Sequence, residues 1–168
     1  MGTASNCKAV YGLSGNGTPA ATNISGTVAI GIGSTPVNFA TCNIAYSFRA
    51  TTTTSGDVVT LTLSTGVAAG TSGSPTIVDG DGKDFEGATL PTMAQLFGIV
   101  IKLIDDPLDD AMTFVAPTAI GDGTIQLGAV FSTFFTGTAG YVVGGNTIVF
   151  SPPAADMVFE VTVVGKTA

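Results

Sequence analysis

The sequence contains no histidine and no tryptophan, and only 10% of its 168 residues are charged. Histidine is the most common general base in enzymes and the most common metal ligand in proteins, so its absence argues against hydrolase, protease and zinc-protein functions. We also find no Gly-x-Ser-x-Gly motif of a nucleophilic serine. The sequence therefore predicts a protein that is not an enzyme, and it indicates no particular reaction.

Positive charge is also scarce, since five cations face twelve acidic residues and give a net charge of −7. A chain of this charge is repelled by phosphate backbones, and its cations are too scattered to form a basic patch. We therefore expect no binding to nucleic acid. No segment reaches the roughly 20 apolar residues that span a bilayer, and the N-terminus lacks the pattern of a secretory signal. We expect neither a membrane protein nor a signal peptide.

The only cysteines are Cys7 and Cys42, which have neither the spacing nor the partners of a metal or redox motif. Two alternatives remain open, namely two buried thiols or a disulfide that joins the N-terminal segment to a strand.

The residues that are abundant favour β-structure. Glycine, threonine, valine and phenylalanine outnumber the strong helix formers, and apolar residues alternate with polar ones in several segments. The clearest alternation covers residues 27–33, 43–49, 57–64, 97–104 and 157–164. In the segment 97–104, Phe97, Ile99, Ile101 and Leu103 are expected to share one face. Weaker strands are expected at 76–79, 112–116, 124–130, 141–143 and 147–151. Residues 90–96 are expected to form one short helical turn.

Glycine-rich turns separate these segments at short intervals, and Gly144-Gly145-Asn146 predicts a tight hairpin between 141–143 and 147–151. This spacing is typical of a sandwich or barrel. We expect an all-β protein, an antiparallel β-sandwich or jelly roll of about ten short strands. Residues 1–168 are expected to form a single domain, with 1–17 as an extended N-terminal arm.

Eight of the twelve acidic residues fall in two clusters, the first within residues 79–86 and the second within residues 105–110. These clusters predict one acidic, solvated edge. Converging carboxylates are what Ca²⁺ requires, because this cation takes about six to eight oxygen ligands. The first cluster is not an EF-hand, since Asp84 stands where that loop needs glycine, so the alternatives are a different Ca²⁺ loop or solvated turns. The first cluster is Asp79, Asp81, Asp84 and Glu86, and the second is Asp105, Asp106, Asp109 and Asp110.

Phenylalanines at 131, 134 and 135 form a second candidate site. In a strand, Phe131 and Phe135 share one face and Phe134 points to the other, so both faces carry an aromatic ring and need to be covered. Core packing can cover one face, and a contact with another subunit can cover the other. We therefore expect Phe131, Phe134 and Phe135 to contribute to a subunit interface.

The segment from Leu90 to Ala168 resembles small β-sandwich or jelly-roll structural proteins of tailed-bacteriophage virions. Three features carry the resemblance: the apolar strand Phe97-Gly-Ile-Val-Ile-Lys-Leu-Ile, the glycine turn at Gly144-Gly145-Asn146, and the closing strand Met157-Val-Phe-Glu-Val-Thr-Val-Val-Gly165. The resemblance implies a subunit that decorates, cements or extends a capsid or tail. It also implies a homo-oligomer, with a trimer favoured, that contacts other virion proteins after assembly in the host cytoplasm.

The expected function is therefore that of a non-enzymatic structural protein of a virus particle, without a resident cofactor. Two alternatives stay open. One is a Ca²⁺-assisted binding module or adhesin that recognises a surface glycan through Asp79–Glu86 or Asp105–Asp110. The other is a subunit of a surface filament.

Overall fold

The structure is a computed structural model that describes residues 42–83, 87–106, 110–135 and 140–168. These residues form eleven strands and no helix, which confirms the expected all-β class. They accordingly include no helix that could cross a membrane. The strands are β1 (Ile44–Thr51), β2 (Val58–Thr62), β3 (Val67–Ser72), β4 (Thr76–Val78), β5 (Met93–Asp105), β6 (Met112–Val115), β7 (Gly123–Ile125), β8 (Val130–Phe134), β9 (Tyr141–Val142), β10 (Thr147–Ser151) and β11 (Val158–Thr167).

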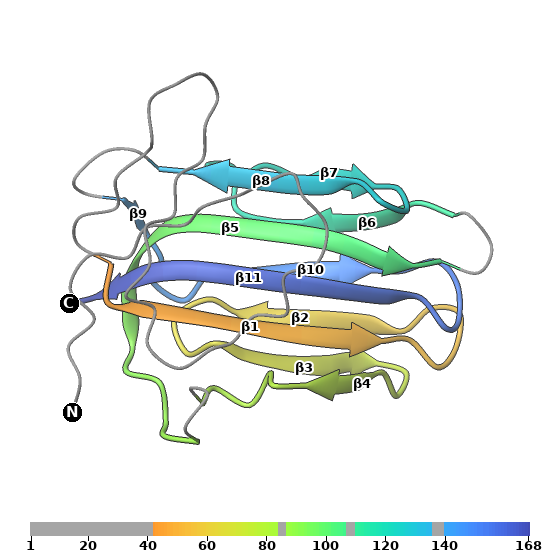
Figure 1. Cartoon of the computed structure of the whole chain (residues 1–168), viewed down its shortest axis with the longest axis horizontal. Helices are drawn as coiled ribbons and strands as arrows, with labels where there is room; N and C mark the ends of the chain where they lie inside the picture. Colours follow the sequence, from red (N-terminus) through yellow and green to blue (C-terminus); the bar gives the residue numbers. More distant parts are fainter. Residues whose placement is uncertain (1–41, 84–86, 107–109, 136–139) are drawn as a thin grey trace.

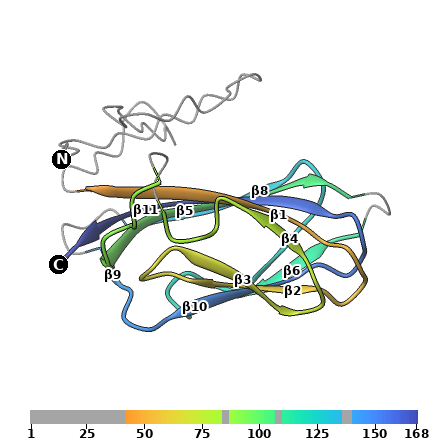
Figure 2. The same ribbon diagram turned by 90° about the horizontal axis from the view of Figure 1, so that it is seen from below.

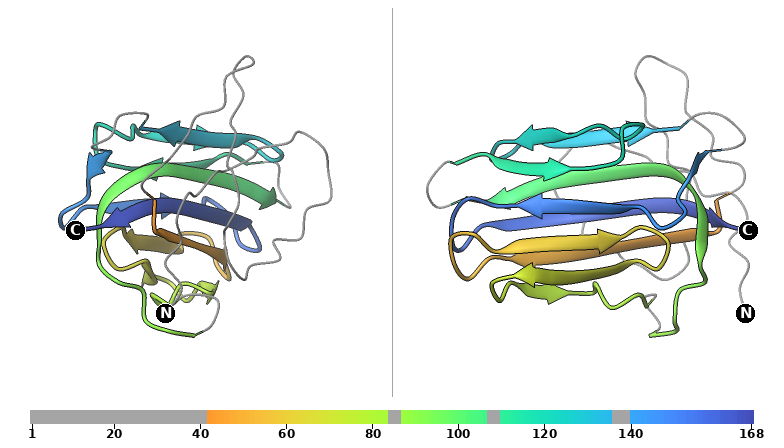
Figure 3. Two further views of the ribbon diagram at one scale, coloured as in Figure 1. Left: turned by 60° about the vertical axis from the view of Figure 1, so that its left-hand side comes forward. Right: turned by 180° about the vertical axis from the view of Figure 1, so that it is seen from behind.

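The strands form two antiparallel sheets that lie face to face, which confirms the expected sandwich (Figures 1 and 2). One sheet has six strands in the order β4-β1-β11-β5-β8, with β9 also paired to β5. The other has five strands in the order β3-β2-β10-β6-β7, and this sheet faces the reader when the molecule is seen from behind (Figure 3, right).

Two similar corners carry the chain from one sheet to the other at the same end of the sandwich. Residues 51–58 lead from β1 into β2, and residues 151–158 lead from β10 into β11. Each corner uses one residue with positive φ, Gly56 at 89° and Asp156 at 61°. The corners are tied together, because the backbone N–H of Thr52 donates to Met157 O at 3.0 Å and its hydroxyl accepts from Met157 N at 2.9 Å. This tie fixes the two crossings relative to each other.

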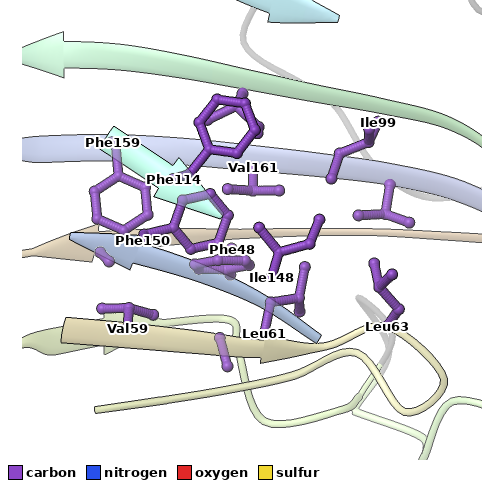
Figure 4. Close-up of a cluster of buried hydrophobic side chains, with 14 of the residues drawn as sticks. Phe48, Val59, Leu61, Leu63, Ile99, Phe114, Ile148, Phe150, Phe159 and Val161 are labelled. Carbon is purple, nitrogen blue, oxygen red and sulfur yellow. The ribbon is translucent and has the colours of Figure 1, made fainter. Parts of the chain in front are cut away.

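Aromatic residues from both sheets meet at the centre of the core (Figure 4). Phe150 of the five-stranded sheet lies 5.1 Å from Phe159 and 6.1 Å from Phe48 of the six-stranded sheet, measured between ring centroids. All three side chains are almost completely buried. Since fully burying such a side chain contributes about 1.5–3 kcal/mol, these contacts hold the two sheets together.

The structure corrects the expected face of Phe97. Opposite β11, Leu96 pairs with Gly165 and Gly98 pairs with Val164, so a β-bulge sets Phe97 outside the regular pairing. The bulge moves Leu96 into the core cluster in the place that strict alternation gave to Phe97. Ile99 and the inward residues after it keep the predicted face, because the pairing is regular from Gly98 to Leu103.

The helical turn expected at residues 90–96 is wrong, since β5 already begins at Met93. The single strand expected at 124–130 is divided into β7 and β8 by a turn in which the N–H of Ala129 donates to Gln126 O at 2.9 Å. In addition, β3 was not expected. Its sequence Val-Ala-Ala-Gly-Thr-Ser has small side chains, so the hydrophobic alternation is weak.

The tight hairpin expected at residues 144–146 is also wrong. The residues do form a turn, in which Asn146 N donates to Val143 O at 3.0 Å. However, β9 pairs with β5 and β10 pairs with β2 and β6, so this turn joins the two sheets. The expected strand at 27–33, the arm at 1–17 and Cys7 lie outside the described residues. Cys42 is buried, and the two alternatives for the cysteines stay open.

Candidate interaction surface

The first acidic cluster is partly described. Asp79 follows β4 with a positive φ of 61°, and Asp81 is exposed in the next turn. The Asp81 carboxylate is already engaged, because Oδ1 accepts the backbone N–H of Lys83 at 3.2 Å and Oδ2 lies 3.4 Å from Lys83 Nζ. Asp84 and Glu86 lie outside the described residues. Within the described part of the chain, no group of three or more potential ligands is placed to hold a metal ion.

The two acidic clusters do not form one edge, so that expectation is wrong. Asp81 forms an isolated bridge with Val67 at the start of β3, near the end of the sandwich where β5 begins. Asp105 is the last residue of β5 and pairs with Val158 at the opposite end. The thirteen residues of β5 separate the two clusters along the long axis (Figure 1). Asp109 lies outside the described residues.

The three phenylalanines occupy both faces of β8 and the residue after it, as the alternation predicted. The Phe131 ring packs into the core, 4.7 Å from the centroid of Phe114, and Phe135 stacks on Tyr141 at 5.6 Å. Phe134 lies on the outer face, where its ring is 2.8 Å from the position of a Cβ added to Gly98. All three rings thus have partners within the chain, and their role in a subunit interface remains a prediction.

A buried carboxylate was not anticipated from the sequence. Asp57 lies at the base of the β1–β2 corner and is fully shielded from solvent. Its oxygens accept the backbone N–H groups of Thr53 at 2.7 Å, Thr54 at 3.2 Å and Ser74 at 3.2 Å. The threonine hydroxyls donate as well, at 3.1 and 2.7 Å. These hydrogen bonds, above all that from Thr53 N–H, hold the pKa of Asp57 far below its usual range.

The position of Asp57 indicates a structural role. The carboxylate joins the corner at 53–57 to the turn between β3 and β4, which also crosses between the sheets. Gly73 makes room for it, because a Cβ at that position would lie 1.6 Å from Asp57 Oδ1. The sequence signals of this arrangement are Thr53-Thr54 shortly before Asp57 and Gly73-Ser74 further along. They do not show that the two turns meet.

The outer face of the six-stranded sheet carries charge. Arg49 on β1 pairs in register with Glu160 on β11, which in turn pairs with Lys102 on β5. The Arg49 Nη2 atom lies 3.2 Å from Glu160 Oε2, and both side chains are partly exposed. Exposed Val78 and Val130 lie at the two ends of this charged row, opposite Arg49 and Lys102 respectively. Alternating charges on neighbouring strands stabilise a solvated sheet face modestly.

Within its five strands, the outer face of the five-stranded sheet carries no charged side chain, and we call it the threonine face. Acidic residues flank it at both edge strands, Asp81 beside Val67 of β3 and Asp122 just before β7. In β2, β6 and β10 its side chains alternate with buried core residues, and in all five strands they are short, since none exceeds valine in size. Sequence reasoning did not find this face, because its membership depends on how distant strands pair. It consists of Val58, Thr60, Thr62, Val67, Ala69, Thr71, Ser72, Thr113, Val115, Thr124, Thr147, Val149 and Ser151.

The rows of the threonine face are in register across the sheet. Thr60 lies opposite Ala69 on one side and Val149 on the other, and Val149 in turn lies opposite Val115. Val115 is the most exposed valine of the face, with 59% of its surface accessible. Such a surface offers no group for acid–base chemistry and suits contact with another uncharged surface.

No protein-family model, curated protein or solved structure matches the chain.

Proposed function

We propose that this protein is a non-enzymatic structural subunit of a virus particle, which mediates contacts between subunits on a capsid or tail. The observation that carries the proposal is the order of eight strands. They form the arrays β1-β11-β5-β8 and β2-β10-β6-β7, with β3, β4 and β9 as additions at the edges. Successive strands of this set lie in opposite sheets at every step except β6–β7.

This order supports a jelly roll made of two interlocked Greek keys. Viral capsid subunits and lectin domains are both built on this arrangement. A fold of this kind hosts several functions, so the surface has to distinguish between them. The threonine face supports a role in assembly, because the buried centres of protein–protein interfaces are depleted of charged residues.

The principal alternative is a Ca²⁺-assisted adhesin, because lectin domains are also built on the jelly roll. The ion pair between Asp81 and Lys83 makes this alternative weaker, because a Ca²⁺ ion would have to compete with the ammonium group for the same carboxylate. We therefore favour the structural subunit.

The proposal is tested on particles purified by density gradient from the culture that produces the chain. Antibodies raised against the full chain should detect it in the particle fraction and label intact particles by electron microscopy. Protein found only in the soluble fraction, with no labelling, would exclude the proposed role. Calorimetric titration with Ca²⁺ separates the alternative, because an adhesin of that kind releases heat and loses thermal stability when EDTA is added.

A further inference from the structure

We infer that the threonine face is the surface through which two copies of this chain pair. The inference rests on the proposed function, in which the protein assembles with itself, and it assigns that assembly to one face. The partner is a second copy of the chain, because the charge, the shape and the area of the face suit one.

The first reason is the distribution of charge. Each copy has a net charge of −7, so two copies repel one another wherever carboxylates face each other. Most described acidic residues lie in corners and loops, and the two in strands, Asp105 at the end of β5 and Glu160 on β11, belong to the six-stranded sheet. The strands of the threonine face carry no charge, so no carboxylates meet across the centre of a contact between two copies. Two acidic molecules therefore approach most easily through this face.

The second reason is the shape of the face. Its side chains are alanine, serine, threonine and valine, so no long side chain projects above the others. Sheets with such side chains stack at about 10 Å, with strand directions inclined by about 30°. A face that meets its own copy forms an isologous contact with twofold symmetry. Threonine hydroxyls both donate and accept hydrogen bonds, so the same residues on two copies can satisfy one another.

The third reason concerns the size of the contact. Five strands spaced about 4.8 Å apart, each contributing about five residues, cover about 400 Å² per copy as a flat rectangle. Corrugation of the side chains adds to this area. The flat area is smaller than that of standard specific interfaces, which bury about 600–1,000 Å² per partner, and is in the size class of weak, transient contacts. We therefore expect a weak, reversible dimer with a dissociation constant in the micromolar range or above.

The twofold pairing differs from the trimer that the resemblance to virion proteins implies. A trimer uses two different patches on each subunit, whereas an isologous contact uses the same patch twice and closes at two copies. The measured mass of the oligomer therefore separates the two arrangements.

The test measures the mass of the full chain by analytical ultracentrifugation from about 1 to about 200 µM. Val115→Glu places a carboxylate on the threonine face, and Thr147→Glu does so on a second strand in case the first variant folds poorly. Val130→Glu is the matched control, because Val130 is a similarly exposed valine, at 50%, on the outer face of the other sheet. Circular dichroism shows which variants keep the fold.

We expect the wild type and Val130→Glu to dimerise equally, and the two threonine-face variants to raise the dissociation constant at least tenfold. If folded variants of the threonine face dimerise like the wild type, the face is wrong while self-association stands. A wild-type trimer, or a wild type that stays monomeric at every concentration, also overturns the pairing. In either case, detection of the chain on purified particles tests the proposed function independently.

Discussion

The two outer faces of the sandwich have the same strand geometry but different chemistry. The six-stranded sheet places Arg49, Glu160 and Lys102 at opposing positions on three neighbouring strands, where water can solvate them. The threonine face places uncharged residues at every position. Because inward residues on both sheets already supply the core, the outward residues contribute little to folding. Their composition therefore supports our proposal that the charged face meets water and the threonine face meets another surface.

The largest expected effect tests the division between inward and outward residues on a single strand. Phe150→Ala removes a ring that contacts both sheets, and it should lower the free energy of unfolding by about 3–5 kcal/mol. Val149→Ala changes the adjacent residue on the threonine face and should cost about 1 kcal/mol or less. Urea unfolding at low protein concentration, where the chain is monomeric, measures both. Similar losses would show that the threonine face contributes to folding.

The next effect concerns the turns that hold the two sheets in place. Gly73→Ala introduces a Cβ that collides with the Asp57 carboxylate at a backbone φ of +71°, and it should cost about 2–3 kcal/mol. Gly56→Ala is the matched control, since its φ is +89° but no atom lies within 4 Å of the added Cβ. The control should cost only about 1 kcal/mol, the strain of the backbone alone. Equal losses would mean that the carboxylate moves aside freely.

Asp57 should also give the fold a specific dependence on pH. Its pKa is lowered in the folded state by hydrogen bonds from Thr53, Thr54 and Ser74. The stability that this shift provides is present above the pKa of the unfolded chain, about 3.9, and is lost as the pH falls towards the folded value. Asp57→Asn should therefore lower the melting temperature on the order of 5 °C at pH 7. The difference from the wild type should shrink as the pH falls below about 4.

Asp156→Asn is the control for this prediction. Asp156 is an exposed aspartate of the other corner, at the position that corresponds to Gly56, so its substitution removes a carboxylate without disturbing the hydrogen bonds around Asp57. If Asp57→Asn and Asp156→Asn melt alike from pH 2 to pH 7, the hydrogen-bonded carboxylate does not stabilise the corner.

The sequence predicted the strands whose side chains alternate between large apolar and polar residues. Ile44, Tyr46 and Phe48 in β1, and Phe159, Val161 and Val163 in β11, lie on the predicted buried faces. Local alternation is sufficient there because both strands are central in the sheet and contribute a full row to the core. The weak alternation of β3 reflects its place at the edge, where only Ala68 reaches the core.

Pairing between distant strands could not be predicted in the same way. The glycine turn at 144–146 has the local features of a hairpin, yet its flanking strands pair with β5 and with β2 and β6. The threonine face could not be predicted for the same reason, since Thr60, Val149 and Val115 become neighbours only when three distant strands are in register. A bulge such as the one at Phe97 depends equally on the partner strand. Local pattern thus predicts most of the side chains that point inward, whereas long-range pairing determines the bulges and the composition of the outer surface.

The smallest expected effect tests the charged row of the six-stranded sheet. Arg49→Gln removes the ion pair with Glu160 and should lower the free energy of unfolding by about 0.2–1 kcal/mol at low salt. The loss should disappear in about 1 M NaCl, where the screening length falls to about 3 Å. Thr113→Gln, an exposed position on the threonine face, should show no such salt dependence. If Arg49→Gln is as stable as the wild type at low salt, the charged row contributes to solubility and not to stability. The chemical difference between the two faces would then reflect only what each face contacts.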